Sequence, residues 1–472
     1  MTTPLLLPPE PFTSLDQYLL AGGGEGWRTA LDAGPEAVLA ALKTSGLRGR
    51  GGAGFPAGRK WASIRAGRPD VGPRFVVANG AEGEPGTFKD RPLMRRNPYQ
   101  VIEGLAIAAT VIGAAQAFIA VKRTFEPEIE ALSRALKEMA EAELLCDAPI
   151  TLVTGPEEYL FGEEKALLEV VEGKEPLPRL YPPYVQGLYG TASESGWEAS
   201  PELMGFDPDV PISNPTLATN VETLANVPLI VSRGAEWFRT MGTEQSPGVA
   251  ICTVVGDVVH DGFGEVELGT PLREVIERIG GGPRAGREIK AVLSGVANPV
   301  LTADQLDTPV SYEGMKEAGT GLGSCGFIVY DETADMVSVA RSVSRFLSVE
   351  SCGQCPPCKL GTMAISERLE RIANAQGTEH DVMEIGGWLG RVSDANRCYL
   401  GEEEQRVISS LLRAFPEEFA AHLEGGPPAE WVPIPKIVDI VDGRAVYDPK
   451  QILKRPDWTY ADAEWQYPHG SA

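Results

Sequence analysis

The sequence predicts an α/β protein in which a parallel sheet is followed by a small α+β unit and then by a helical bundle. Three observations predict this order. Strands and helices alternate between residues 75 and 153, the chain becomes β-rich from Val249, and helical periodicity dominates from Thr333. A chain of 472 residues is also too long for one ordinary core, so we expect it to divide into domains.

The parallel sheet is expected because one helix separates each apolar strand from the next. Asn97-Pro98 is a strong helix start, since Asn caps helices and Pro suits the first helical position, and Gly113 ends that helix. Right-handed crossovers of this kind place successive strands parallel to one another. The predicted strands are Phe75–Asn79, Ala117–Val121 and Ile150–Val153, with helices at Asn97–Ile112 and Glu126–Leu144 between them.

The later part of the chain divides into two further units. Residues 201–228 are expected to be loop-like and to end in a short helix. The β-rich stretch then predicts strands at Ala250–Val255, Val266–Leu268 and Ile289–Leu293, with a helix at Pro271–Ile279. The bundle predicts helices at 333–349, 358–375, 380–391 and 401–422.

Composition excludes some classes of function. The formal net charge is −24, from 42 Lys and Arg against 66 Asp and Glu, so the chain repels phosphate backbones and we expect no nucleic-acid partner. Residues 1–12 carry no basic residue and do not form a secretory signal. The most apolar stretch, Gly104 to Val121, is interpreted as a buried helix followed by a buried strand. We therefore expect a soluble, cytoplasmic protein without direct membrane insertion.

The strongest single signal is a set of four cysteines. Cys352, Cys355 and Cys358 stand at two-residue gaps in one short loop, and Cys398 follows forty positions later. Three closely spaced thiolates and a fourth from afar are typical of a [4Fe–4S] cluster. Structural zinc is the alternative, but it is usually bound by paired C-x₂-C knuckles.

The other three cysteines are not expected to be ligands. Cys146, Cys252 and Cys325 lie in apolar or Gly-rich surroundings, where buried and inert thiols are the usual case. The loop that holds Cys325 could approach the cluster.

A glycine-dense loop precedes the first strand. Gly49-Arg-Gly-Gly-Ala-Gly54 matches G-x-G-x-x-G, but a dinucleotide fingerprint would follow a strand instead of preceding it. Its backbone N–H groups can still cradle a phosphate, and Lys60 can add positive charge. The basic spot from Arg48 to Lys60 favours an anionic small molecule, and a structural hinge is the alternative.

Two further segments follow predicted strands. Residues 79–91 come after the first strand and residues 159–164 come after the third. The carboxyl edge of an open α/β sheet is where ligands bind, so both segments are expected at one site. Glu163 and Glu164 have a second interpretation, as an acidic first turn that the helix dipole favours, and both interpretations can hold together.

Five motifs in this order together resemble the NADH-oxidising flavoprotein subunit of respiratory complex I and its relatives, the diaphorase subunits of NAD-linked hydrogenases and formate dehydrogenases. They are Gly46–Trp61, Asn79–Arg91, Gly162–Glu164, Thr219–Pro228 and the Cys352–Cys398 set. The resemblance spans roughly residues 35–425.

The resemblance implies a Rossmann-like FMN-binding domain, a small β-grasp (soluble-ligand-binding) domain and a helical bundle with one [4Fe–4S] cluster. The implied boundaries are 1–35 for an N-terminal extension that wraps a neighbouring surface, 36–240, 241–332, 333–425, and 426–472 for a C-terminal tail. The implied cofactor-binding residues are Gly49, Arg50, Gly51, Gly52, Phe55, Lys60, Asn79, Glu82, Gly162, Glu163, Glu164, Asn220 and Thr223. Phe55 and Glu164 face the nicotinamide nucleotide in this assignment, Glu82 and Glu164 are the catalytic candidates, and the four cysteines bind the cluster.

The implied reaction passes a hydride from NADH to FMN and then single electrons through the cluster to a partner. The resemblance implies a thioredoxin-like [2Fe–2S] partner subunit and further electron-transfer subunits, with peripheral membrane association through a larger complex as one arrangement. A non-catalytic electron relay or scaffold that does not oxidise NADH is the alternative.

The chain departs from the family at four positions near the nucleotide. Ala81, Ser63 and Tyr181 stand where the family usually has an acid, an aromatic residue and a Lys, while Tyr184 replaces a Phe and keeps a ring. One hypothesis is weaker or retuned NADH binding, with NADPH or a protein as alternative donors; the other is a compensated pocket that still uses NADH, because Phe55 and Glu164 remain. A last hypothesis concerns aromatic residues of the Pro-rich tail, which dock on a partner unless the tail folds back on its own bundle; they are Trp431, Trp458, Tyr460, Trp465 and Tyr467.

Overall fold

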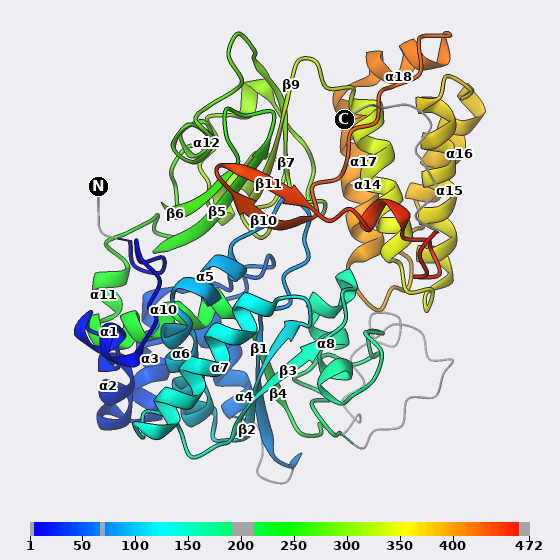
Figure 1. Cartoon of the computed structure of the whole chain (residues 1–472). Coiled ribbons are helices and arrows are strands. Elements are labelled where there is room, and N and C mark those ends of the chain that lie inside the picture. Colours follow the sequence, from blue (N-terminus) through cyan, green and yellow to red (C-terminus); the bar gives the residue numbers. More distant parts are fainter. Residues whose placement is uncertain (1–3, 67–70, 191–211, 462–472) are drawn as a thin grey trace.

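The computed structural model describes residues 4–66, 71–190 and 212–461. Figure 1 shows three bodies, of which one carries a parallel sheet, the second carries a five-stranded sheet and the third is a bundle of helices. The predicted fold class is confirmed.

The first body is built on a four-stranded parallel sheet in the order β3-β2-β1-β4. The three predicted strands are confirmed, but the fourth lies in a segment that was expected to be loop-like. Its sequence is short and partly polar, and pairing with β1 is what buries its first three residues. The strands are β1 (Arg74–Asn79), β2 (Ala114–Lys122), β3 (Ile150–Gly155) and β4 (Thr216–Asn220).

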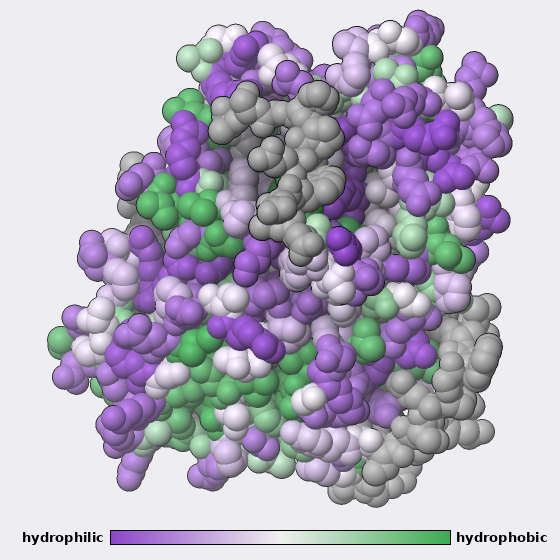
Figure 2. All heavy atoms as spheres, turned by 45° about the vertical axis from the view of Figure 1, so that its right-hand side comes forward, coloured by the Kyte–Doolittle hydropathy of each residue, from purple (hydrophilic) through white to green (hydrophobic). Residues whose placement is uncertain are grey.

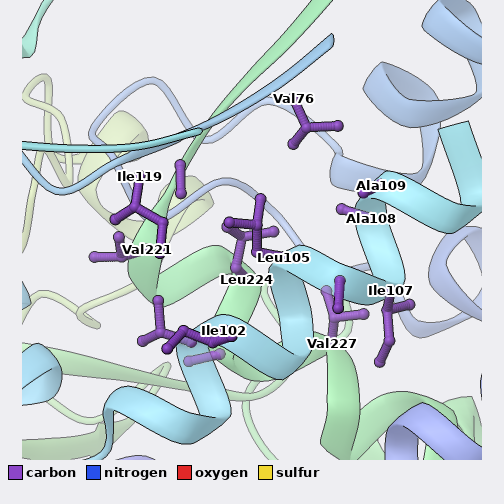
Figure 3. Packing of buried hydrophobic residues seen from close by; sticks show 14 of the residues in the cluster. Val76, Ile102, Leu105, Ile107, Ala108, Ala109, Ile119, Val221, Leu224 and Val227 are labelled. Carbon is purple, nitrogen blue, oxygen red and sulfur yellow. The ribbon is translucent and has the colours of Figure 1, made fainter. Parts of the chain in front are cut away.

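Helices α6 and α10 pack closely against the sheet. A Cβ on Gly104 of α6 would meet the carbonyl oxygen of Leu224 on α10 at 2.1 Å, so only glycine allows this approach. Leu105 and Leu224 are fully buried beside it (Figure 3). The helices of this body after β1 are α5 (Asp90–Arg96), α6 (Pro98–Ile112), α7 (Glu126–Glu141), α8 (Glu164–Val171), α10 (Val221–Arg233) and α11 (Ala235–Phe238).

Asn97 occupies the position before α6, as predicted, but its side chain does not cap the helix. It donates to the carbonyl oxygen of Leu6 and to the side-chain oxygen of Gln100 instead. The apolar stretch from Gly104 is confirmed as a buried helix followed by a strand, because α6 ends at Ile112 and β2 begins at Ala114. In the part of the chain that the structure describes, no helix has the length and apolarity needed to cross a membrane.

The N-terminal segment packs into the first body. Glu103 of α6 accepts hydrogen bonds from the Tyr18 hydroxyl at 2.6 Å and from the backbone N–H groups of Gly24 and Trp27 at 2.8 Å. Residues predicted as an extension thus belong to the same core as the sheet. This segment forms α1 (Leu15–Leu20) and α2 (Glu25–Ala33), and α3 (Pro35–Ser45) and α4 (Ala57–Arg65) follow it.

The second body is a mixed sheet in the order β6-β5-β9-β7-β8. The central strand β9 was not predicted, although all six of its residues are buried. The elements of the second body are β5 (Val249–Gly256), β6 (Gly262–Glu267), α12 (Leu272–Gly280), β7 (Ile289–Ser294), β8 (Leu301–Thr302), η3 (Ala303–Gln305), α13 (Tyr312–Glu317) and β9 (Gly326–Asp331).

The third body contains five helices in its described part. The predicted helix over 401–422 is wrong in one respect, because a new helix begins at Pro416, which cannot continue the preceding one. On the face shown in Figure 2, hydrophilic residues dominate this bundle. The helices are α14 (Met336–Glu350), α15 (Pro356–Ala373), α16 (Glu379–Leu389), α17 (Leu400–Ala414) and α18 (Pro416–Leu423).

The described part of the C-terminal tail folds back on the protein. It forms β10 (Ile437–Val441), β11 (Arg444–Tyr447) and η4 (Gln451–Leu453). The Trp458 ring N–H donates to the carbonyl oxygen of Val349 at 2.9 Å, and the ring of Trp431 lies under the guanidinium of Arg341.

The alternative to partner docking is therefore confirmed for this part of the tail. Trp465 and Tyr467 lie outside the described residues.

A buried ion pair fixes the tail to the bundle. Lys454 Nζ lies 2.8 Å from Glu350 Oε2, and both side chains are fully buried. We expect Lys454→Met to lower the free energy of unfolding by about 3–5 kcal/mol, because it leaves the Glu350 charge buried without its partner. Urea denaturation monitored by circular dichroism measures this change.

The exposed Lys450, four residues earlier, supplies the matched control. Lys450→Met should leave stability unchanged, and adding Glu350→Gln to Lys454→Met should recover part of the loss. Equal stability of the Lys454 and Lys450 variants would show that the buried pair contributes nothing.

Candidate functional site

The predicted site residues meet at the carboxyl edge of the parallel sheet. Asn79 ends β1, Asn220 ends β4, and the two lie opposite each other in register. The Asn79 side-chain amide donates to the carbonyl oxygen of Gly162 at 2.7 Å, and its oxygen accepts from the backbone N–H of Ala81 at 3.1 Å. These bonds draw the short helix η2 (Tyr159–Gly162) against the end of β1.

The glycine loop closes over the same edge. The Gly49 N–H donates to the carbonyl oxygen of Phe55 at 2.9 Å, and the Arg50 N–H donates to the Thr223 hydroxyl at 2.8 Å. A Cβ on Gly51 would lie only 3.2 Å from the Cβ of Asn220. Gly52 has φ +115°, which side-chain-bearing residues rarely adopt.

The loop presents unused donors. Among the described residues, the backbone N–H groups of Gly51 and Gly52 donate to no protein acceptor. A Cβ on Gly52 would be in ordinary contact with the backbone of Gly323 and Ser324, at 3.9 and 4.0 Å. Adjacent free N–H groups bind phosphate oxygens, and the residues present therefore fit a phosphate-bearing cofactor.

Arg50 contributes to the loop in a different way. Its guanidinium donates to the carbonyl oxygens of Arg48, Pro247 and Val249, so it clamps the loop to the beginning of β5. The main chain of Arg50 lies in the predicted loop, while its side-chain charge serves the junction between the first and second bodies.

The open side of the site carries the predicted nucleotide-facing residues. Lys60 Nζ lies 2.8 Å from Glu164 Oε2, and both side chains are partly exposed. Phe55 is 53% exposed and Tyr184 is 42% exposed. Burial and then the Glu164 carboxylate raise the pKa of Tyr184, which places that ring near the pair.

The Glu82 carboxylate is used in hydrogen bonds to the protein backbone. It accepts the backbone N–H groups of Lys89, Asp90 and Arg91, at 2.8, 3.0 and 3.4 Å, and so anchors the start of α5. Burial, and then the Asp90 carboxylate, raise the pKa of Glu82 to about 7.

Sequence reasoning did not single out Lys89 and Glu222. Lys89 Nζ contacts Asp90 at 2.6 Å, Glu222 at 2.8 Å and Asn220 at 3.3 Å, and the ammonium group is buried. Because the Lys89 charge is buried between the carboxylates of Asp90 and Glu222, it holds the ends of β1 and β4 together. Lys89 lies in the Asn79–Arg91 motif and Glu222 in the Thr219–Pro228 motif, and these positions were the signal that could have identified them.

Glu163 confirms the helix-terminus interpretation. It stands at the N-cap of α8, and one carboxylate oxygen accepts the backbone N–H groups of Lys165 and Ala166 at 2.9 Å. Burial raises the pKa of Glu163 to about 7. Its neighbour Glu164 points to Lys60 instead, so the two adjacent acids have separate roles.

The four predicted cysteine ligands line one pocket. Cys352, Cys355, Cys358 and Cys398 surround it together with Leu160, Pro178, Ser351 and Leu400, among others. In the described ranges, no three His, Cys, Asp or Glu side chains converge on a point where a single metal ion would fit. The four cysteines therefore lie around one pocket, which fits the cluster that their spacing predicts.

The electrostatics of the pocket fit a polynuclear iron centre. Burial raises the pKa of the Cys358 thiol to about 12. Burial, and then the Glu163 carboxylate, raise the pKa of Cys398 well above its usual range. Cysteine ligands bind metal as thiolates, and bound iron would supply the positive charge that stabilises them.

Cys325 does not reach this pocket. It packs with Cys252 in the apolar core of the second body.

The short helix η2 separates the two sites. Leu160 lines the cysteine pocket, and Gly162, two residues later, accepts the hydrogen bond from Asn79 at the sheet edge. The sheet-edge site and the thiol pocket are therefore separated only by the few residues of η2.

Two family models match the chain in these regions. The Nuo51 FMN-binding domain matches residues 42–229, and the NADH-ubiquinone oxidoreductase-F iron-sulfur binding region matches residues 338–422. The NADH-quinone oxidoreductase F 2 subunit of Rhizobium meliloti is 36% identical over 424 residues, which cover 87% of this chain and 94% of the relative. The chain belongs to the family of NADH-quinone oxidoreductase F subunits.

The family also includes hydrogenase subunits. NADP-reducing hydrogenase subunit HndC of Solidesulfovibrio fructosivorans is 34% identical over 420 residues. The matched region covers 87% of this chain and 81% of HndC. A crystal structure of NAD+-reducing [NiFe]-hydrogenase in the H2-reduced state aligns with a TM-score of 0.72 at 32% identity, over 90% of this chain and 69% of that one. The chain is an NADH dehydrogenase-type electron-transfer subunit with FMN and one [4Fe–4S] cluster, and the family works together with other electron-transfer subunits.

Glu404 gives the stability of the helical bundle a pH dependence. This fully buried acid on α17 accepts the Ser344 hydroxyl of α14, and burial raises its pKa from 4.5 to about 8. A raised carboxyl pKa means that the folded state loses stability as pH rises through that window. We expect the unfolding free energy of Glu404→Gln to rise relative to the wild type progressively from pH 4.5 to 8, by at most about 1.4 kcal/mol per pH unit, and its melting temperature to rise with it.

Glu402→Gln is the matched control, because Glu402 is partly exposed beside Arg406. Its effect should be small and independent of pH. Melting curves at constant iron content check both variants, and a pH-independent gain for Glu404→Gln would contradict the buried-acid explanation.

Proposed function

We propose that the residues at the sheet edge hold FMN, with its phosphate on the free N–H groups of Gly51 and Gly52 and beside Lys60. The position of η2 is the observation that carries this proposal, because it places the sheet edge next to the thiol pocket. The rest of the predicted set, from Asn79 and Glu82 to Asn220 and Thr223, fixes the walls of that site through the hydrogen bonds described above.

Bound FMN would supply the chemistry of hydride acceptance from NADH and of one-electron release to the cluster. The protein binds and orients the reactants. Phe55 offers an exposed ring on the open side, and the Lys60–Glu164 pair stands beside it as the polar contact for the nucleotide. Glu82 acts from below by holding the start of α5, and its catalytic role is therefore one of positioning.

Cys352, Cys355, Cys358 and Cys398 would bind the cluster. Lys359, next to Cys358, donates its ammonium hydrogens to the carbonyl oxygens of Ser348, Ser351 and Pro456. This positive charge lies beside the pocket and offsets part of the negative charge that a thiolate-bound cluster carries.

The domain boundaries follow the three bodies. We assign residues 36–240 to FMN binding, 241–332 to the β-grasp domain and 333–425 to the cluster, with residues 1–35 and 426–472 as flanking segments. The described parts of both flanks pack on these domains, which supports treating them as structural.

A thioredoxin-like [2Fe–2S] subunit is the proposed partner, beside the flavin domain. An acidic chain of net charge −24 suits a basic partner face. NADH-quinone oxidoreductase relatives belong to larger assemblies, and we propose a cytoplasmic subunit that is peripheral to the membrane in such a complex. The alternative of a relay that does not oxidise NADH gains no support from the relatives.

Two substitutions should separate the cofactor sites. Gly52→Val should weaken FMN binding about tenfold to hundredfold, because φ +115° strains a β-branched residue by about 1–3 kcal/mol, and the iron content should stay. Cys358→Ala should lose the cluster and keep the flavin. Flavin fluorescence after denaturation and iron content per chain measure both.

Gly387→Ala, where a Cβ meets nothing, and Cys146→Ala, outside the pocket, are the controls and should keep both cofactors. Loss of iron in the Gly52 variant together with the flavin would contradict two separate sites.

The departures from the family predict altered donor preference. Ser63 lies one turn after Lys60 on α4 and donates to its carbonyl oxygen, so the missing aromatic ring would have stood beside the nucleotide-facing pair. Losing one stacked ring and one charge contact costs about 1–3 kcal/mol, or one to two decades in NADH affinity. Anaerobic titration with NADH and with NADPH, monitored by flavin bleaching, measures the affinity for each nucleotide.

Ser63→Phe should tighten NADH binding, and Ser63→Ala, which adds no ring, should not. NADH affinity typical of the family in the unaltered protein would refute the retuning.

A further inference from the structure

Three parts of the chain meet at the hydroxyl of Tyr159, the first residue of η2. Its oxygen lies 2.5 Å from Glu84 Oε2 in the loop after β1, and 3.2 and 3.3 Å from the two carboxyl oxygens of Glu403 on α17. The other oxygen of Glu84 accepts the backbone N–H of Val296 from the second body at 2.6 Å. Glu403 is buried, at 7% exposure.

Counting hydrogens decides the protonation of this trio. The Tyr159 hydroxyl carries one hydrogen, and two ionised carboxylates carry none, so one hydrogen would have to serve both acids. Glu84 receives the closer contact and a second donor from Val296, which suits an ionised carboxylate. In the described part of the chain, Glu403 has no donor other than Tyr159, and a buried ionised carboxylate in that position would be left nearly unsatisfied.

We propose that Glu403 is held as a protonated carboxylic acid that donates to Tyr159, which donates in turn to an ionised Glu84, so that the trio stores one proton beside the iron–sulfur pocket. Burial, and then the Glu84 carboxylate, raise the pKa of Glu403 well above its usual range, which agrees with this assignment. The Glu163 and Glu402 carboxylates raise this pKa further, and Arg406, one turn later on α17, is paired with Glu402.

The stored proton lies close to the thiol pocket. Glu403 stands one helical turn after Leu400, Tyr159 directly precedes Leu160, and both leucines line the pocket. The proton limits the pair to one negative charge instead of two, and a smaller negative charge favours electron uptake by a bound cluster. Glu403 thus acts on electron uptake by the cluster through its charge and does not touch the reacting atoms. This part of the inference rests on the proposed cluster site.

Glu84 connects the trio to a polar cavity. It is one wall of a space of about 140 Å³ beneath the sheet edge, large enough for a few water molecules. Water in this cavity can exchange protons with Glu84. The charged groups that face this cavity are Glu82, Arg91, Lys122, Glu157, Lys436 and Asp448.

Infrared spectroscopy tests the proton directly, with or without cofactors. Glu403→Gln should remove one carbonyl absorption of a protonated carboxyl group at neutral pH. Glu402→Gln, whose side chain is partly exposed beside Arg406, should remove none. Glu404→Gln serves as a reference for a second buried acid. An unchanged spectrum in Glu403→Gln would overturn the proposal.

A redox titration of the cluster tests its consequence. Gln mimics a neutral acid, so Glu403→Gln should keep the midpoint potential of the wild type at neutral pH. Glu84→Gln removes the ionised member and should shift that potential upward. An equal upward shift in both variants would show that Glu403 is ionised and would overturn the proposal. A wild-type protein without a cluster signal would instead refute the proposed function, and the infrared result would stand.

Discussion

The four residues of η2 are the constraint on which the rest of the arrangement depends. The carbonyl of Gly162 is bonded to Asn79 at the end of the parallel sheet, and the backbone N–H of Tyr159 donates to Glu350 at the end of α14. Four residues span at most about 14 Å, so the sheet edge and the bundle cannot separate without breaking these bonds. The flavin-binding region and the cluster region of this family are thereby held as neighbours.

Buried charges join segments that are far apart in the sequence. Lys89 is paired with Glu222 below the glycine loop, and Lys454 with Glu350 beneath the tail. Such pairs add little net stability relative to apolar contacts, but they penalise any other arrangement because an unpaired charge would stay buried. The Arg50 guanidinium has the same effect through carbonyl oxygens, since it ties the glycine loop to the second body.

The chemistry is divided between rigid and open surfaces. Glu82 and Glu163 hold helix starts through backbone N–H groups, whereas Phe55 is exposed and the partly exposed Lys60 and Glu164 are paired with each other. Ser63 is exposed, so the departure from the family at that position leaves the core undisturbed.

The sequence by itself determined the motifs: four thiols at cluster spacing, a glycine loop able to expose N–H groups, and polar residues after apolar strands. These are local patterns, and the alternating strands of the parallel sheet were equally local. Strand β9 was missed although Phe327–Tyr330 is a local run of aromatic and β-branched residues. Strand β4 was not predictable, since its burial comes only from pairing with β1, which is distant in the chain. The protonation of Glu403 was likewise decided by the tertiary structure alone, because it arises where one Tyr159 hydroxyl meets two acids from different parts of the chain.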